Sequence, residues 1–180
     1  MKRERMNSTS MQSAISRLAE DFVKREADAS SFAFIGIRSR GDIIMERFRA
    51  SVTALVKKPI DTGTLDITFY RDDLSRRIEM PEVKETRIPF DITNRKILLI
   101  DDVFFTGRTI RAAMNALFDY GRPSLIRLLV LVDRASRELP IVPDYIGTAV
   151  AAKRTDIVNV TLTETDGTDA VIIEEIEEKA

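Results

Sequence analysis

The 180-residue sequence contains no cysteine and no histidine. The absence of cysteine excludes disulfide bonds, thiolate nucleophiles and cysteine-ligated metal clusters. The absence of histidine excludes Ser-His-Asp catalysis, a histidine general base and the usual zinc sites. These two absences remove several common enzyme mechanisms before any motif is considered.

Long hydrophobic runs are also missing. No apolar segment approaches the roughly 20 residues of a membrane-spanning helix, and residues 1–8 lead into no hydrophobic signal core. We therefore expect a cytoplasmic protein without a membrane partner. With 44% hydrophobic residues, the chain can form a single domain with a sizeable core. We expect a flexible tail over residues 1–10 and one domain over residues 11–180.

The most informative segment is an apolar run, residues 97–100, followed by two carboxylates, Asp101 and Asp102. Four apolar residues in a row are typical of a strand buried on both faces of a parallel sheet. Helical spacing resumes after residues 106–109, and Gly121 provides a stop. The turn therefore lies at the carboxyl end of a strand and before a helix, where open α/β sheets bind ligands.

The turn itself has the chemistry of a phosphate site. Gly107 permits close approach of the backbone, Thr106 and Thr109 supply hydroxyl groups, and Arg108 follows the glycine with a positive charge. Unpaired N–H groups at a helix N-terminus add donors for a phosphate dianion. The adjacent carboxylates would instead accept hydrogen bonds from two ribose hydroxyl groups. The two halves together predict a ribose 5-phosphate site.

Residues 97–109 resemble the thirteen-residue phosphoribosyl-pyrophosphate (PRPP) motif of type I phosphoribosyltransferases. Segments 63–75, 121–124 and 132–140 extend the likeness to one branch, the pyrimidine-operon regulators with uracil phosphoribosyltransferase activity. The match covers nearly the whole chain, about residues 15–160. For the motif taken alone, the alternative is an ordinary strand-turn-helix junction with an acidic turn.

The resemblance implies an α/β fold with an open, mostly parallel sheet flanked by helices, a small hood and a flexible loop. Strands that alternate with helices independently predict a parallel sheet with right-handed crossovers. Hydrophobic periodicity predicts helices over residues 11–27, 43–55 and 110–117, and strands over residues 32–37, 65–70, 97–100, 125–132, 145–150 and 157–162.

Two further loops complete the PRPP site by resemblance. Residues 38–41 correspond to the pyrophosphate loop, where two forked guanidinium groups and a glycine suit a diphosphate; an exposed basic turn is the alternative. Residues 70–87 correspond to the flexible loop that covers the reacting centre and excludes water. Its candidate lid residues are Arg71, Asp72 and Asp73. The PRPP-binding set is Ser39, Arg40, Gly41, Asp101, Asp102, Val103, Phe104, Phe105, Thr106, Gly107, Arg108 and Thr109.

The reaction implied by the resemblance is transfer of 5-phosphoribosyl from PRPP to N1 of uracil, which gives UMP and pyrophosphate. The predicted catalytic residues are Asp101, Asp102 and Arg40, and the two carboxylates would stabilise positive charge that develops on the ribose. Mg²⁺ would arrive with PRPP, without direct protein ligands. We identify no general base.

Phe105 favours a pyrimidine over a purine. Phosphoribosyltransferases for 6-oxopurines carry an Asp at this position that handles N7 of the purine, and phenylalanine cannot take a proton. By resemblance, Arg134 and Val158 are the candidate uracil contacts. A structural role for Arg134, paired with Asp133 or Glu138, is the alternative. A phosphoribosyltransferase for a different base is the alternative enzyme.

RNA-binding members of this branch attenuate transcription by clamping leader messenger RNA when uridine nucleotides are bound. Arg17, Arg25 and Arg38 match their basic face. Each lost cation removes a phosphate contact, and an added carboxylate such as Glu20 repels the RNA backbone. The chain departs from the basic or histidine residues of those members at Glu20, Ser136, Val142 and Thr148.

From this branch we expect UMP and UTP as regulatory ligands, weak binding of pyrimidine-operon leader mRNA, and a homo-oligomer of two or more chains. A uracil phosphoribosyltransferase without RNA binding is the alternative. Synthesis of UMP and regulation through RNA can coexist in one chain, because the nucleotide site can serve both as a catalytic site and as a sensor.

Overall fold

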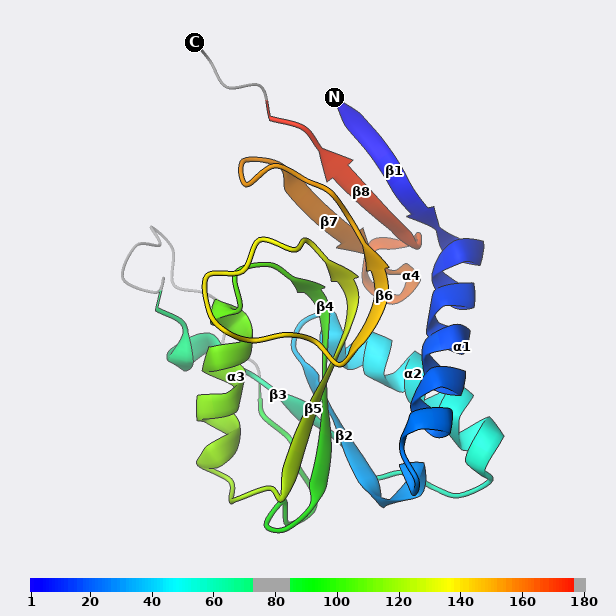
Figure 1. The fold of residues 1–180 in the computed structure, drawn as a ribbon, viewed down its shortest axis with the longest axis vertical. Helices are drawn as coiled ribbons and strands as arrows, with labels where there is room; N and C mark the ends of the chain where they lie inside the picture. Colours follow the sequence, from blue (N-terminus) through cyan, green and yellow to red (C-terminus); the bar gives the residue numbers. More distant parts are fainter. Residues whose placement is uncertain (73–84, 177–180) are drawn as a thin grey trace.

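A computed structural model of the protein describes residues 1–72 and 85–176. Its main feature is a five-stranded parallel sheet with the strand order β3-β2-β4-β5-β6. The strands are β2 (Phe32–Ile37), β3 (Thr62–Leu65), β4 (Lys96–Phe104), β5 (Leu125–Asp133) and β6 (Tyr145–Ala149). Figure 1 shows this sheet in the lower part of the molecule, in agreement with the predicted α/β fold.

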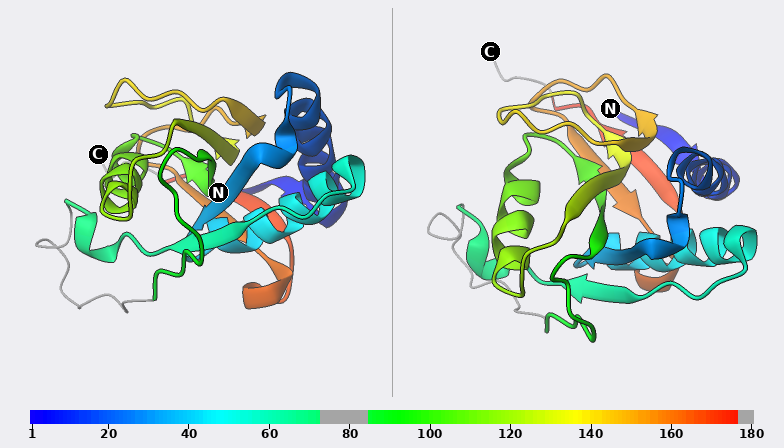
Figure 2. Two further views of the ribbon diagram at one scale, coloured as in Figure 1. Left: turned by 90° about the horizontal axis from the view of Figure 1, so that it is seen from below. Right: turned by 60° about the horizontal axis from the view of Figure 1, so that its bottom comes forward.

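Helices cover both faces of this sheet. They are α1 (Ser8–Arg25), α2 (Gly41–Val56) and α3 (Arg108–Phe118). Figure 2 shows α3 on the opposite side of the sheet from α1 and α2. Successive strand residues point to opposite faces, so Leu98 belongs to the core under α1 and α2 whereas Leu99 belongs to the core under α3. Unbroken apolar strands are the consequence of this double burial.

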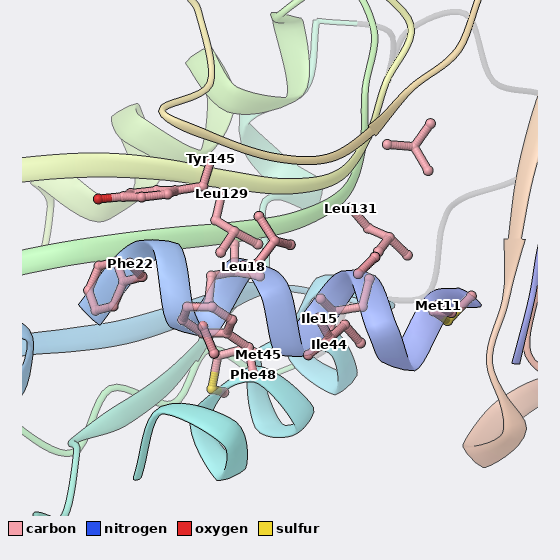
Figure 3. Close-up of a cluster of buried hydrophobic side chains, with 14 of the residues drawn as sticks. Met11, Ile15, Leu18, Phe22, Ile44, Met45, Phe48, Leu129, Leu131 and Tyr145 are labelled. Atoms are coloured by element: carbon pink, nitrogen blue, oxygen red, sulfur yellow. The ribbon is translucent and has the colours of Figure 1, made fainter. Parts of the chain in front are cut away.

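Phe22 lies at the centre of the core under α1 and α2. Its ring is edge-on to those of Phe32, Phe34 and Phe48, at centroid distances of 5.2, 5.5 and 5.7 Å, and to that of Tyr145 at 5.4 Å. Figure 3 shows the labelled side chains of α1 against those of α2 and β5. This packing fixes α2, and with it the turn that precedes α2, relative to the sheet.

The two ends of the chain form a second, antiparallel sheet, which we call the hood. Its strand order is β1-β8-β7, with β1 (Lys2–Asn7), β7 (Ile157–Thr161) and β8 (Ala170–Glu174). The short helix α4 (Thr163–Asp166) connects β7 to β8. Figure 1 shows the hood above the arrowheads of the main sheet. The hood therefore covers the sheet edge at which the sequence predicts the ligand site.

The prediction of a flexible tail over residues 1–10 is wrong. Residues 2–7 pair with β8, so that Lys2 lies opposite Glu174. Asn7 then caps α1, because its side-chain oxygen accepts a hydrogen bond from the N–H of Ser10 at 3.0 Å. The strand was not predicted because most of its side chains are exposed and its partner strand is at the other end of the chain.

The strand predicted over residues 65–70 is also wrong in its bounds, because β3 ends at Leu65. The carboxylate of Asp66 accepts hydrogen bonds from the N–H and the hydroxyl group of Thr68. This local turn competes with an extended strand. The chain consequently continues as a 3₁₀ helix, Thr68–Tyr70.

The other predicted helices and strands are present with modest shifts of their ends. β8 was not predicted, although β7 beside it was. Among residues 1–72 and 85–176, no helix is both long enough and apolar enough to cross a membrane.

Candidate active site

Asp101 and Asp102 lie in the carboxyl-terminal half of β4, at the edge covered by the hood. Asp101 is 5% exposed, and its Oδ1 accepts a hydrogen bond from the N–H of Asp102 at 2.9 Å. Oδ1 of Asp102 accepts one from the N–H of Val103 at 2.8 Å. Burial raises the pKa of both carboxyls, and the adjacent charge of Asp102 raises that of Asp101 further. Such a pair is suited to a ligand that brings hydroxyl donors or positive charge.

The turn after β4 is shaped by a glycine and by the segment that follows β5. Gly107 has a φ of +92°, a conformation that other residues rarely adopt. The carbonyl oxygen of Thr106 accepts hydrogen bonds from the N–H groups of Glu138 at 2.9 Å and Leu139 at 3.2 Å. These contacts hold the turn open at the N-terminus of α3.

A pocket of about 180 Å³ lies over this turn. Seven predicted PRPP-binding residues, 103–109, and two predicted lid residues, Arg71 and Asp72, line it together. Gly107 is the N-cap residue of α3, so N–H groups of the first helical turn lie at the pocket. The structure therefore brings together a cavity and the donor groups that an anionic ligand needs.

The exposed side chain of Arg108 lines this pocket. Its Nη1 is 2.8 Å from a carboxylate oxygen of Asp72, and its Nε is 2.8 Å from one of Glu138. Arg111 also pairs with Asp72, at 2.9 Å. The Arg108 guanidinium lowers the pKa of the Asp72 carboxyl, and a phosphate in the turn would compete with both carboxylates for Arg108. The third predicted lid residue, Asp73, lies outside the described residues.

Residues 38–40 form the turn between β2 and Gly41, the first residue of α2, and the peptide bond between Arg38 and Ser39 is cis. A Cβ atom on Gly41 would lie 2.5 Å from the carbonyl oxygen of Ile100. A real Cβ cannot approach so closely, so only glycine fits without a shift of the backbone. Gly41 therefore lets the predicted pyrophosphate turn pack directly against β4, beside the carboxylate pair.

Arg40 connects this turn to the hood. Its Nη2 is 3.2 Å from Oδ1 of Asp166, at the end of α4, and its charge opposes the burial that raises the pKa of Asp102. Arg38 lies on the neighbouring position with its Nε 3.8 Å from a carboxylate oxygen of Asp42. No local pattern predicts Asp166 as part of this site, because its position depends on how the hood folds back over α2.

Arg134 is almost fully buried, with 8% of its surface exposed. Its guanidinium carbon lies 3.8 Å from the ring centroid of Phe105. Its Nη2 donates hydrogen bonds to the carbonyl oxygens of Lys153 at 2.9 Å and Asp156 at 2.8 Å. Arg134 thereby joins the turn after β4 to the loop that leads into β7.

The predicted alternative for Arg134, an ion pair with Asp133 or Glu138, is not what the structure shows. Asp133 pairs with Arg137 at 2.7 Å, and Glu138 pairs with Arg108 as described above and with Arg154. Arg134 instead binds the two carbonyl oxygens of the loop.

A second pocket, of about 890 Å³, opens beside Arg134. It is lined by Arg134, Ala135, Ser136, Val150, Ala151, Ala152, Lys153, Asp156, Glu175 and Ile176. Val158, the other predicted uracil contact, lies in β7 and packs partly buried against the hydrophobic core. The structure thus places the two predicted base contacts on different elements. It also adds Lys153 and Asp156, whose proximity to Arg134 depends on the tertiary fold.

The predicted RNA-binding residues Arg17 and Arg25 both reach β6, the edge strand of the main sheet. Arg17 donates a hydrogen bond to the carbonyl oxygen of Gly147. Arg25 donates one to that of Asp144 at 2.9 Å and stacks on the ring of Tyr145. These two guanidinium groups therefore cover open backbone acceptors at a sheet edge. Arg38 lies apart from them, in the turn before α2.

The match to protein families agrees with this geometry. The model of the phosphoribosyl transferase domain matches residues 7–175. This chain belongs to the phosphoribosyltransferase family. Among its curated relatives are the bifunctional proteins PyrR of Deinococcus deserti, 47% identical over 92% of this chain and 90% of the relative, and of Thermus thermophilus, 45% identical over 94% of both. The chain thus belongs with the bifunctional PyrR proteins.

Solved structures show the same fold at low sequence identity. A hypoxanthine-guanine phosphoribosyltransferase from Bacillus anthracis is 14% identical, with a TM-score of 0.69 over 98% of this chain and 100% of the other. A hypoxanthine phosphoribosyltransferase from Trypanosoma cruzi is 13% identical, with a TM-score of 0.69 over 97% of each. The predicted fold, the predicted family and the predicted enzyme class are confirmed.

Proposed function

We propose that this phosphoribosyltransferase transfers 5-phosphoribosyl from PRPP to N1 of uracil, releasing pyrophosphate, and that uridine nucleotides in the same site regulate pyrimidine biosynthesis genes. The observation that carries the proposal is the pair of buried Asp101 and half-buried Asp102 beside a donor-lined turn with its own pocket. Carboxylates suit the ribose hydroxyl groups, and the turn suits the 5-phosphate.

In this proposal the two carboxylates also act on the transition state. Breaking the bond between ribose and pyrophosphate leaves positive charge on the sugar, and negative groups held in a water-poor site stabilise it strongly. Arg40, from the turn before α2, would stabilise the negative charge on the departing pyrophosphate. The lid residues Arg71 and Asp72 line the turn pocket, so they are placed to exclude water when the loop closes.

Mg²⁺ fits the donor set of this site as a partner of PRPP. The described residues contain no group of three carboxylates, histidines or cysteines that could hold a metal by themselves. Asp101 and Asp102 could contact it through the ribose hydroxyl groups or water, since Mg²⁺ commonly keeps several waters and substrate oxygens as ligands. When bound, Mg²⁺ neutralises charge on the pyrophosphate.

Uracil would occupy the Arg134 end of the second pocket. Arg134 and Lys153 line that pocket, and cationic donors suit the two carbonyl oxygens of the base. Phe105, where purine enzymes have an acidic residue, contacts the Arg134 guanidinium. The pocket thus offers donors on the base side without an acid at the turn, which favours a pyrimidine.

Regulation through RNA is the second part of the proposal. The candidate RNA-binding surface on α1 offers few free cations to an RNA backbone. Arg17 and Arg25 already bind the carbonyl oxygens of Gly147, in β6, and Asp144, just before β6, and Glu20 on the same helix adds negative charge. We therefore propose that the nucleotide site dominates the function and that binding of pyrimidine-operon leader mRNA is weak. By its family we also propose that the protein is cytoplasmic and forms a homo-oligomer. Sedimentation of the purified protein would test the oligomer.

The decisive experiment is an assay of the purified protein with PRPP and Mg²⁺ against uracil, orotate, hypoxanthine and adenine. We expect UMP formation with uracil and at most trace products with the other bases. Preferential turnover of another base would move the proposal to a different phosphoribosyltransferase. No turnover of any base, with UMP still bound, would reduce the protein to a nucleotide sensor.

A further inference from the structure

The short helix α4 of the hood is fastened to α2 by arginine-carboxylate pairs. Arg47, on α2, is 2.5 Å from a carboxylate oxygen of Glu164 and 2.8 Å from one of Asp169. At the N-terminal end of α2, nearer the active site, Arg40 is 3.2 Å from Asp166. The first of these attachments holds the segment between β7 and β8 in place, and the second reaches the predicted pyrophosphate turn.

Asp166 is held firmly on its own side. Its Oδ2 accepts hydrogen bonds from the N–H of Leu162 at 2.9 Å and from the hydroxyl group of Thr165 at 2.8 Å. These bonds, the first of them above all, lower the pKa of the Asp166 carboxyl, so it carries a negative charge near neutral pH. Its other oxygen, Oδ1, faces Arg40. Asp166 is therefore a fixed acceptor rather than a mobile surface carboxylate.

Arg40 depends on this acceptor for its direction. Its Nε is buried and has no hydrogen-bond partner within the described chain. Its Nη2 bonds to Asp166, and the described residues give Nη1 no hydrogen bond. Asp166 is thus the group that orients the guanidinium, while Nη1 remains available to an incoming oxygen.

We propose that Asp166 is a positioning residue for the phosphoribosyl transfer: it fixes the Arg40 guanidinium over the pyrophosphate of PRPP while α4 stays fastened to α2 through Arg47. The inference rests on the proposed function, since it assigns Arg40 to the pyrophosphate. It makes the hood part of the pyrophosphate site as well as a cover for the sheet edge. A pre-oriented guanidinium binds a diphosphate with a smaller loss of side-chain entropy.

The test is steady-state kinetics of Asp166→Asn with PRPP and uracil varied separately. We expect the KM for PRPP and the inhibition constant of pyrophosphate each to rise about five- to tenfold, the range for a partly exposed charged contact. The KM for uracil should stay within about twofold, because the contact does not reach the base pocket. Asp166→Glu should recover part of the loss.

Glu164→Gln is the matched control, since Glu164 lies on the same short helix but pairs with Arg47. It should leave both KM values near wild type, because Arg47 keeps its pair with Asp169 and α4 stays attached to α2. A double variant with Arg40→Ala decides the mechanism: if Asp166 acts through Arg40, then Asp166→Asn adds nothing once Arg40 is removed. Full additivity, or a KM for PRPP that is unchanged or lower in Asp166→Asn, would overturn the inference.

Two readouts separate this inference from the proposed function. If the wild-type protein turns over no uracil, the proposed function fails. If the wild type is active and Asp166→Asn has an unchanged KM for PRPP, only the role of Asp166 is contradicted. Calorimetric binding of pyrophosphate to the wild type and both Asp166 variants gives an answer without turnover. If Asp166→Asn does not fold, Asp166→Glu measured in the same way still decides, because a displaced carboxylate should also weaken pyrophosphate binding.

Discussion

The edge of the main sheet and the hood above it are built in opposite ways. At the sheet edge, the carboxylate pair and the phosphate turn come from one continuous segment, residues 97–109. The carboxylates there are shaped by near neighbours, as when Asp101 accepts a hydrogen bond from the next residue. In the hood, Lys2 lies opposite Glu174, and α4 is attached to α2 through side chains.

This difference shows which parts of the proposed site depend on local sequence and which depend on the tertiary fold. The proposed ribose and phosphate contacts all lie within one local motif, which is why a short segment of sequence predicts them. The proposed orientation of Arg40 and the walls of the second pocket come from segments that only the tertiary fold brings together. Variants of the two regions should therefore fail in different ways.

The largest expected effect is at the local motif. Replacing both Asp101 and Asp102 with Asn should lower kcat/KM by about 10³-fold, because two preorganised negative charges are lost at the reacting sugar. Steady-state turnover of uracil measures the loss. Asp61→Asn, an exposed carboxylate that pairs with Arg95, is the control and should keep full activity. Retained turnover in a folded double variant would end the assignment of the pair to the ribose.

The next effect tests the close packing of the pyrophosphate turn on β4. Gly41→Ala should lower the free energy of unfolding by about 2–4 kcal/mol, because its Cβ would meet a backbone oxygen at 2.5 Å. Urea unfolding measures this change. The control is Gly167→Ala in the hood, where a Cβ meets nothing within 4 Å and the cost of φ +76° should be about 1 kcal/mol. Equal losses in both variants would contradict the argument from packing.

A smaller effect separates the base from the sugar. Arg134→Ala should raise the KM for uracil about tenfold through loss of a buried, charged donor, with a much smaller change for PRPP. Arg95→Ala removes a surface ion pair and serves as the control. A rise confined to PRPP would show that Arg134 supports the turn through Phe105 rather than the base.

The carboxylate pair also predicts how stability depends on pH. Burial places the folded-state pKa of both carboxyls above the unfolded value, so the folded protein binds more protons and loses stability as pH rises through that window. Without ligand at neutral pH, the double Asn variant should therefore melt higher, by about 2–4 °C for each 1 kcal/mol relieved. The difference should shrink toward about pH 4. Thermal scans with identical melting temperatures at all pH values would refute this.

The smallest effect concerns the α1 arginines. Arg17→Ala should lower the free energy of unfolding by about 1 kcal/mol, because it uncovers a carbonyl oxygen at the sheet edge. It should change RNA affinity little, since we expect only weak binding of a pyrimidine-operon leader to the wild type. Tight, UMP-enhanced binding that Arg17→Ala abolishes would reverse this view. Arg49→Ala, which removes a surface pair with Glu46, controls for loss of charge.

The sequence predicted the elements whose signals are local. β2 begins and ends where the apolar run predicts, and the motif supplies the turn that starts α3. The two errors have different physical origins. β1 has no hydrophobic pattern of its own, and β3 was extended too far because a single side chain, Asp66, bends the chain after Leu65.

The candidate site divides in the same way. Residues 103–109 line one pocket as a contiguous motif should, whereas Arg108 is engaged by Asp72 and Glu138, partners that come from two other segments. Arg134 was chosen by resemblance, but its contacts with Phe105 and the loop at Lys153 depend on the fold.

By itself, the sequence determined the buried strand, the two acids and the glycine turn at the sheet edge, because these features depend mainly on neighbours a few residues away. Only the tertiary structure decided that Asp166 meets Arg40 and that α1 arginines cover the edge of β6. Such contacts depend on how strands pair and helices pack across the whole chain, and no short pattern encodes a partner more than a hundred residues distant.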